Sequence, residues 1–230
     1  MVDVGGNYRG ILERIAAAAE KVRRDPREIR LLAAAKSQSV ESIRAALAAG
    51  VALVGENYVQ EALDKKKLIS EPIEWHMIGH LQRNKARAAL DLFDLIESLD
   101  NFALARELDK EGDRRGRTIR AFVEVNLGGE ESKSGIARDQ VSALLEQVGT
   151  LSHIRVEGLM TVPPFRENLE EVRRYFRELR ELRDSLAALR VPNVELKELS
   201  MGMTNDYTVA VQEGATIVRL GTGLFGPRSR

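Results

Sequence analysis

The sequence contains no cysteine, so the chain can form no disulfide, no thiolate metal site and no cysteine nucleophile. Its 35 basic residues are balanced by 35 acidic ones, and it therefore lacks the basic surplus that non-specific nucleic-acid binding requires. No apolar run is long enough to span a bilayer. The first ten residues do not show the basic and hydrophobic segments of a secretory signal. We therefore expect a cytoplasmic protein that binds neither nucleic acid nor membrane.

Strand-like and helical segments alternate along the chain. Hydrophobic residues make up 43% of the 230 residues, which is enough to fill a core. A helical pattern at 7–24 comes first, and eight apolar runs follow, each separated from the next by a helical pattern. These runs are 29–35, 51–57, 74–80, 95–100, 119–127, 154–162, 195–202 and 216–221.

This alternation predicts the fold. Strands that are separated by helices pair in parallel. Eight such units in a chain of this length predict a closed (β/α)8 barrel of the TIM type, with the helix at 7–24 as an extra N-terminal element. An open, doubly wound α/β sheet is the alternative. No linker rich in proline or serine divides the chain, so we expect one domain that covers residues 1–230.

The first apolar run ends at Lys36, a residue type that rarely enters a core without a partner. The carboxyl ends of the strands form the active face of such a barrel, and Lys36 lies at one of these ends. The ordinary interpretation is a lysine whose amine reaches solvent. The functional interpretation is an amine whose charged form is disfavoured by apolar surroundings, and such an amine can form a Schiff base with an aldehyde.

The last run leads into a glycine-rich segment, "GTGLFG", at 221–226. It matches the dinucleotide fingerprint, but only residues 227–230 follow, so a dinucleotide site is excluded. What it can form is a turn whose N–H groups hold one phosphate, with Thr222 as a further donor. Ser200, Gly202 and Gly221, together with Thr222, lie in the loops after the seventh and eighth expected strands, where barrels often bind phosphate. A plain tight turn is the alternative.

Arg219 lies inside the last apolar run, where an arginine is costly unless it is paired or functional. It precedes Gly221 by two residues, so both share one face of the strand, and Arg219 is expected to point inward beneath the phosphate. The alternative is a structural ion pair. His76 and His80 lie four residues apart on the expected third strand without a matching acid cluster, so we expect no metal site.

Taken together, these motifs resemble the pyridoxal phosphate homeostasis protein family, which is related to the N-terminal barrel of alanine racemase. The resemblance covers nearly the whole chain. It rests on "AAAKSQS", "GENYVQEA", "WHMIGHLQRNK", "VNLGGEESKSGI", "GLMTVPP" and "LSMGMTNDYTVAVQEGATIVRLGTGLFGPR". It implies a protein that holds pyridoxal 5'-phosphate as a reversible lysine aldimine and contributes to vitamin B6 and amino-acid homeostasis, with apo forms of pyridoxal-phosphate-dependent enzymes as recipients.

The resemblance also implies roles for single residues. Lys36 would bear the internal aldimine, Arg219 would meet the pyridine nitrogen, and Asn57 would line the side of the ring. An arginine in that place keeps the pyridine nitrogen unprotonated, because a fixed positive charge opposes a second one. The implied phosphate contacts are Ser200, Met201, Gly202, Gly221 and Thr222.

The family relationship raises the question of catalysis. Alanine racemases carry a second, β-rich domain that supplies a tyrosine base, whereas this sequence ends directly after the phosphate turn. A racemase needs two proton-transfer groups on opposite faces of its substrate. We therefore expect a monomeric carrier and no catalytic residues. An alanine-racemase-like enzyme with weak activity on amino acids is the alternative, and a Schiff-base aldolase without the cofactor is a third interpretation.

Lys133 lies in "GGEESKSG", in the loop after the fifth apolar run. This loop is expected on the same rim as Lys36, and its glycines allow it to approach the site. A second lysine there is predicted to assist cofactor release. The alternative is a solvated lysine that pairs weakly with Glu130 or Glu131.

Overall fold

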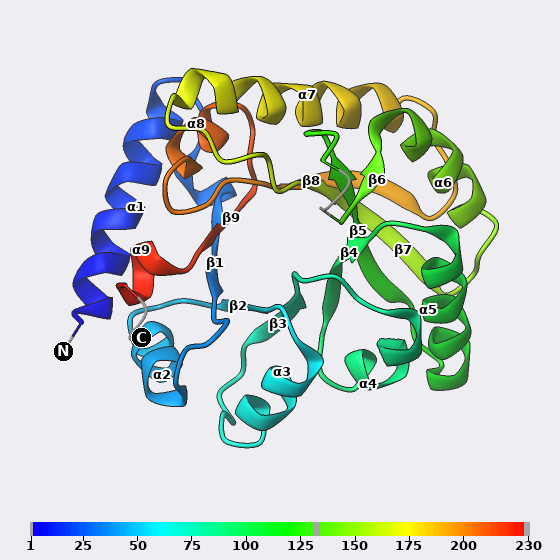
Figure 1. Cartoon of the computed structure of the whole chain (residues 1–230), viewed down its shortest axis with the longest axis horizontal. Coiled ribbons are helices and arrows are strands. Elements are labelled where there is room, and N and C mark those ends of the chain that lie inside the picture. Colours follow the sequence, from blue (N-terminus) through cyan, green and yellow to red (C-terminus); the bar gives the residue numbers. More distant parts are fainter. Residues whose placement is uncertain (1, 131–133, 228–230) are drawn as a thin grey trace.

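In the computed structural model, which describes residues 2–130 and 134–227, eight parallel strands close into a barrel surrounded by helices (Figure 1). The strands are β1 (Arg30–Ala34), β2 (Leu53–Glu56), β3 (Glu74–Met77), β4 (Leu95–Leu99), β5 (Ile119–Asn126), β7 (Ile154–Met160), β8 (Val194–Ser200) and β9 (Ile217–Leu220). Pairing of β4 with β5, and of β1 with β9, closes the ring. The predicted (β/α)8 barrel is confirmed, and the open sheet is excluded because the ring has no free edge.

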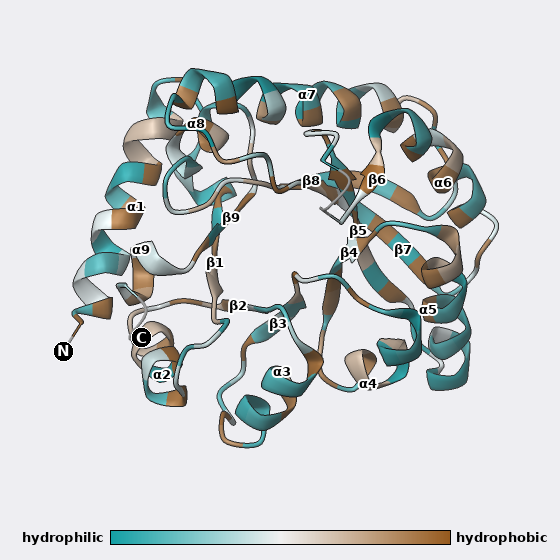
Figure 2. Ribbon diagram, in the orientation of Figure 1, coloured by the Kyte–Doolittle hydropathy of each residue, from teal (hydrophilic) through white to brown (hydrophobic). Residues whose placement is uncertain are grey.

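The helices follow the strands along the chain. They are α1 (Val4–Glu20), α2 (Val40–Ala48), α3 (Val59–Lys66), α4 (Ala86–Leu90), α5 (Phe102–Arg115), α6 (Val141–Val148), α7 (Leu169–Ala187), α8 (Tyr207–Gln212) and α9 (Thr222–Phe225). Their ends follow local chemistry. The side chain of Asn101 accepts a hydrogen bond from the Leu104 N–H at the start of α5, and Gly116 ends that helix at φ 61°. Figure 2 shows hydrophilic and hydrophobic residues mixed along the surrounding helices, as expected where one face covers a barrel.

The extra N-terminal helix is also confirmed. Helix α1 packs against α8 and α9, and the Asn7 side chain donates to the Leu224 carbonyl at 2.9 Å. Arg14 donates to the Tyr207 hydroxyl at 2.6 Å. The first helix therefore holds the elements that flank the last strand. In the described part of the chain, no helix has both the length and the apolar composition needed to cross a bilayer.

Three local features differ from the expectation. A two-residue strand, β6 (Ile136–Ala137), pairs with the end of β5, and it is too short to show an alternating pattern. A one-turn helix, α9, stands where only a turn was expected. Only one of the two histidines lies on the third strand: β3 includes His76 as expected, but it ends at Met77, so the placement of His80 on this strand was wrong. At Gly79 the chain passes so close to Asn57 that an added Cβ would lie 2.7 Å from its Cα, which leaves no room for a side chain.

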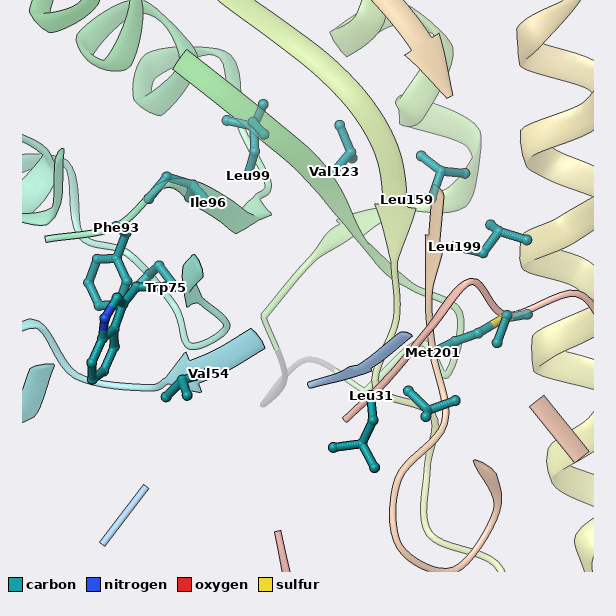
Figure 3. Close-up of a cluster of buried hydrophobic side chains, with 14 of the residues drawn as sticks. Leu31, Val54, Trp75, Phe93, Ile96, Leu99, Val123, Leu159, Leu199 and Met201 are labelled. Atoms are coloured by element: carbon teal, nitrogen blue, oxygen red, sulfur yellow. The ribbon is translucent and has the colours of Figure 1, made fainter. Parts of the chain in front are cut away.

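The inside of the barrel is filled in layers. Inward-facing apolar side chains form a plug of Leu32, Leu53, Leu95, Phe122, Met160 and Ile217. Their outward-facing neighbours along the strands pack under the helices, and Figure 3 labels several of them, including Leu31, Val54 and Leu199. Ion pairs lie beside the plug, where Arg120 bonds to Glu74 at 2.6 Å and to Glu157 at 2.8 Å. A filled interior leaves the carboxyl ends of the strands as the place for a site.

Phe122→Ala is expected to lower the free energy of unfolding by about 3–5 kcal/mol, because it removes a fully buried ring from the centre of the barrel. The matched control is Phe165→Ala, since that ring is 71% exposed, and its effect is expected to stay within about 0.5 kcal/mol. Urea titration followed by circular dichroism measures both changes. Equal losses in the two variants would show that Phe122 does not support the interior.

Candidate functional site

Lys36 lies at the barrel mouth, two residues after the end of β1 and close to β2. The backbone pairing continues past the strand, since the Ala35 N–H donates to the Gly55 carbonyl at 2.9 Å. The Lys36 ammonium sits 5.1 Å from the centre of the Tyr58 ring, a cation–π arrangement. The side chain is only partly exposed. Its amine is therefore held near the rim and does not extend freely into solvent.

The glycine-rich segment begins beside β1. A Cβ added to Gly221 would meet the Ala34 carbonyl oxygen at 3.5 Å, an ordinary contact, so there is space above Gly221 for a group the size of a methyl. Ala34 precedes Lys36 by two residues. The closure of the barrel thus brings the predicted phosphate turn beside the end of β1, two residues before Lys36.

A hydroxyl that the sequence analysis did not single out joins the two predicted phosphate loops. The Thr204 hydroxyl accepts from the Gly223 N–H at 3.0 Å and lies 3.3 Å from the Thr222 hydroxyl. Thr204 follows Gly202 by two residues in "SMGMTND", and a hydroxyl inside that motif is the signal that could have found it. Gly202 has φ +94°, and an added Cβ would lie 2.5 Å from the Ala210 Cβ, so this position requires glycine.

Arg219 is buried and paired, as the structural alternative expected, and its role toward a ligand stays a prediction. Its two terminal nitrogens donate to the Ser200 hydroxyl at 2.7 Å and to the Thr161 carbonyl at 2.8 Å. The Glu97 carboxylate lies 3.9 Å away. Burial lowers the pKa of the Arg219 guanidinium, and the negative charge of Glu97 opposes that shift. The side chain is fixed in place at the carboxyl ends of the strands.

Ser200 is fully buried. Its hydroxyl donates to Glu97 at 2.5 Å while it accepts from Arg219. A phosphate contact from this hydroxyl would therefore require it to leave Glu97. Met201 is also buried, and its N–H donates to the Ile217 carbonyl at 3.1 Å. Ser200 and Met201 thus hold the start of the loop after β8 against the inside of the barrel and against β9.

His76 extends the same network across the interior. Its Nδ1 lies 2.6 Å from Glu97, and its Nε2 lies 3.2 Å from Glu74. Burial lowers the pKa of His76, but the two carboxylates outweigh burial and raise it to about 9.

The sequence analysis did not single out Glu97. The signal that could have found it is an acid in the middle of the apolar run "LIESLD". Within residues 2–130 and 134–227, no cluster of potential ligands could hold a metal ion.

Glu124, on β5, is a second buried acid that the sequence analysis missed. It is 7% exposed, and its Oε2 has no hydrogen-bond partner among the residues that the structure describes. Burial, together with repulsion from Asp100, raises the pKa of Glu124 to about 7, although Arg219 acts in the opposite direction. This carboxyl can therefore hold a proton near neutral pH beside the charged network.

Asn57 lies at the edge of the group. It follows β2 and, with Tyr58, lines a cavity of about 730 Å³ between α3 and α4 whose lining includes neither Lys36 nor the glycine loops. The predicted residues at the ends of β1, β8 and β9 lie at one end of the barrel, and Asn57, which follows β2, lies at that same end and also lines this neighbouring cavity. Lys133 lies outside the described residues.

The assembled groups fit a ligand of a particular chemistry. An amine at the rim suits an aldehyde, and space above Gly221 with nearby hydroxyl and N–H groups suits one small anion. A buried guanidinium suits a hydrogen-bond acceptor such as a ring nitrogen. An aldehyde-bearing aromatic phosphate combines all three.

Comparisons with known proteins agree with this chemistry. The model of the alanine racemase N-terminal domain matches residues 9–229. A protein of Aquifex aeolicus named pyridoxal phosphate homeostasis protein is 46% identical over 95% of each chain. The structure of PipY of Synechococcus elongatus with pyridoxal phosphate bound superposes with a TM-score of 0.82 at 37% identity and covers 92% of this chain and 100% of that chain. An alanine racemase of Clostridium difficile, at 14% identity and a TM-score of 0.74, shares the fold over 98% of this chain and 58% of its own.

Glu124→Gln is expected to stabilise the protein above pH 7 but not below pH 4.5. The pKa of Glu124 rises from 4.5 to about 7 on folding, so its contribution to stability is fully present below the lower value and is lost as pH rises through the higher one. The advantage of the variant should grow by about 3 kcal/mol across that range.

Urea denaturation of both proteins at a series of pH values measures this difference. Glu20→Gln, at an exposed position on α1, controls for the loss of one carboxylate from the chain. An advantage that does not change with pH would contradict the raised pKa of Glu124.

Proposed function

Since the chain belongs to the pyridoxal phosphate homeostasis protein family, we propose that it holds pyridoxal 5'-phosphate as a reversible aldimine with Lys36. The observation that carries the proposal is the meeting of Lys36 and Gly221 at the ends of two paired strands. Ala34, two residues before Lys36, is the residue against which a Gly221 Cβ would lie. The backbone that leads to Lys36 thus lies beside the turn assigned to the phosphate, and this supports a site for a small phosphorylated aldehyde.

The chemistry needs no further reagent. Condensation of the neutral Lys36 amine with the aldehyde replaces a C=O bond with a C=N bond and releases one water molecule. Water reverses the reaction, and neither direction requires an oxidant or a metal. The aromatic face of Tyr58 keeps the Lys36 amine at the mouth before the reaction.

We assign the remaining contacts as follows. The turn at Gly221 and Thr222 holds the phosphate, supported by the Thr204 hydroxyl and by the backbone of Met201 and Gly202. Ser200 contributes through its hydroxyl once that group turns from Glu97. Arg219 meets the pyridine nitrogen, and Asn57 closes the side of the ring.

Arg219 favours storage over catalysis. Its guanidinium is fixed by Ser200, Thr161 and Glu97, and a fixed positive charge opposes protonation of the pyridine nitrogen. With that nitrogen neutral, the cofactor is a weak electron sink and stabilises a carbanion poorly. This supports a carrier that contributes to intracellular pyridoxal phosphate and amino-acid homeostasis.

The carrier acts, in this proposal, as a monomer whose residues 1–230 form a single cofactor-binding domain. It delivers the cofactor to apo forms of enzymes that depend on it, and Lys133 assists the release. The names of the relatives and the cofactor-bound PipY structure support this role. The alternative is weak racemase-like turnover. Incubation of the cofactor-loaded protein with single enantiomers of amino acids tests it. Formation of the opposite enantiomer would show that the protein is an enzyme and would contradict the carrier proposal.

Lys36→Ala is expected to abolish the visible absorption band of the aldimine while leaving weaker, non-covalent binding of the cofactor. The phosphate turn does not depend on this side chain, so equilibrium dialysis should still detect binding. The control is Lys67→Ala, at an exposed position at the end of α3, which should keep the aldimine band. If borohydride fixed the cofactor equally well in Lys36→Ala, on another lysine, the assignment of Lys36 would be wrong.

Gly221→Ala is expected to weaken pyridoxal phosphate binding by about tenfold, because a methyl group would fill the space assigned to the phosphate. Binding of pyridoxal, which has no phosphate, should not change. The thermal midpoint should also stay constant, since the added Cβ has room beside Ala34. Gly10→Ala, on α1, is the control, and equal losses for both ligands would show that the turn does not bind the phosphate.

A further inference from the structure

We propose that Glu61 and Lys65, on α3, position Lys36 by holding the backbone on both of its sides. The inference rests on the proposed function, in which Lys36 bears the cofactor, and it identifies the groups that keep that amine in place. Neither residue lies in the proposed phosphate turn or in the Arg219 network.

Lys65 holds the residue that precedes Lys36. Its ammonium donates to the Ala35 carbonyl at 2.8 Å, to the Glu56 carboxylate at 2.5 Å and to Glu61 at 3.3 Å. An ammonium has three N–H donors, and here each has an acceptor. The Lys65 side chain is only 11% exposed and Glu56 is fully buried. Lys65 therefore ties the ends of β1 and β2 to α3.

Glu61 holds the residue that follows Lys36. Its carboxylate accepts a hydrogen bond from the Ser37 N–H at 3.0 Å. Burial acts to raise the pKa of Glu61, but the Ser37 N–H and the Lys65 ammonium outweigh burial and lower it. The carboxylate thus stays charged and remains a strong acceptor for that N–H.

The backbone at Ser37 explains why such a restraint is needed. Ser37 has φ +61°, a left-handed conformation that costs free energy for any residue with a Cβ. Without a restraint, this peptide would relax to a commoner conformation and carry the Lys36 side chain with it. Glu61 and Lys65 stand one helical turn apart, so a single face of α3 fixes both flanks of Lys36.

The first test uses the protein without cofactor, so it does not depend on the proposed function. Amide hydrogen exchange at Ser37 should be faster in Glu61→Ala than in the parent. Glu61→Gln keeps an acceptor oxygen and should restore protection. Glu61 is partly exposed, so both variants are expected to fold. Unchanged exchange in Glu61→Ala would overturn the proposal.

The second test measures the rate at which borohydride-fixable cofactor accumulates on Lys36 after pyridoxal phosphate is added. Glu61→Ala should be slower by about tenfold, because displacement of a reacting group by a small distance has a large effect on rate. Glu61→Gln should match the parent. Asp64→Ala is the matched control, since this carboxylate lies on the same helix but is 62% exposed and contacts Lys67. Equal rates in Glu61→Ala and the parent would overturn the positioning role.

A second-site substitution distinguishes a loss of Lys36 positioning from a general loss of structure. Ser37→Gly removes the Cβ that makes φ +61° costly, so it should recover most of the lost rate in the Glu61→Ala background. In the Lys36→Ala background, Glu61→Ala should leave non-covalent affinity unchanged, because the restraint acts only through Lys36. A failure of Ser37→Gly to recover any rate, or a loss of affinity without Lys36, would overturn the proposal. If borohydride fixed no cofactor on Lys36 in the parent protein, the proposed function would be wrong. The hydrogen-exchange measurement at Ser37 would still test whether Glu61 holds the backbone beside Lys36.

Discussion

Backbone hydrogen bonds between β9 and β1 join the last strand of the chain to the first, and the geometry of the site depends on this pairing. Leu32 pairs with Arg219 and Ala33 with Leu220, so the residue after β9 meets the last residue of β1. An amine from the start of the sequence and a glycine-rich turn from its end then share one rim. The extra helix α1 stabilises this seam, because it packs on both α8 and α9.

The charged side chains of the Arg219 network are tolerated inside the barrel because each one has a hydrogen-bond or ion-pair partner. An isolated buried guanidinium would be very costly, but Arg219 is bonded to Ser200 and to a carbonyl, and Glu97 lies beside it. Glu97 in turn pairs with His76. Through His76 the network continues to Glu74 and to Arg120, whose side chains are partly exposed. The result is a fixed positive charge whose position does not rely on a bound ligand.

The lysine and the phosphate turn have separate supports. Helix α3 holds the peptides on either side of Lys36 through Lys65 and Glu61. The turn at Gly221 is instead braced by Thr204, and the strand that leads into it is held where the Arg219 N–H donates to the Gly202 carbonyl. In the proposed carrier, the covalent link can therefore be broken without disturbing the phosphate turn. A cofactor held by two independent attachments can be released in two steps, which suits storage and delivery.

The sequence by itself determined the barrel, the extra helix and the nature of the candidate site. Periodic apolar runs are a local property, and an interruption such as Lys36 or Arg219 is visible within one run. Tertiary structure alone decided which groups meet. Glu61 and Lys65 showed no distinctive local pattern. Glu97 and Thr204 each had a local signal, but it did not identify their partners, which lie on other strands or loops. The end of β3 before His80 and the close approach of Gly79 to Asn57 were equally hidden, because the approach joins two separate segments of the chain. Such contacts arise only when the ring of strands closes and brings distant segments together.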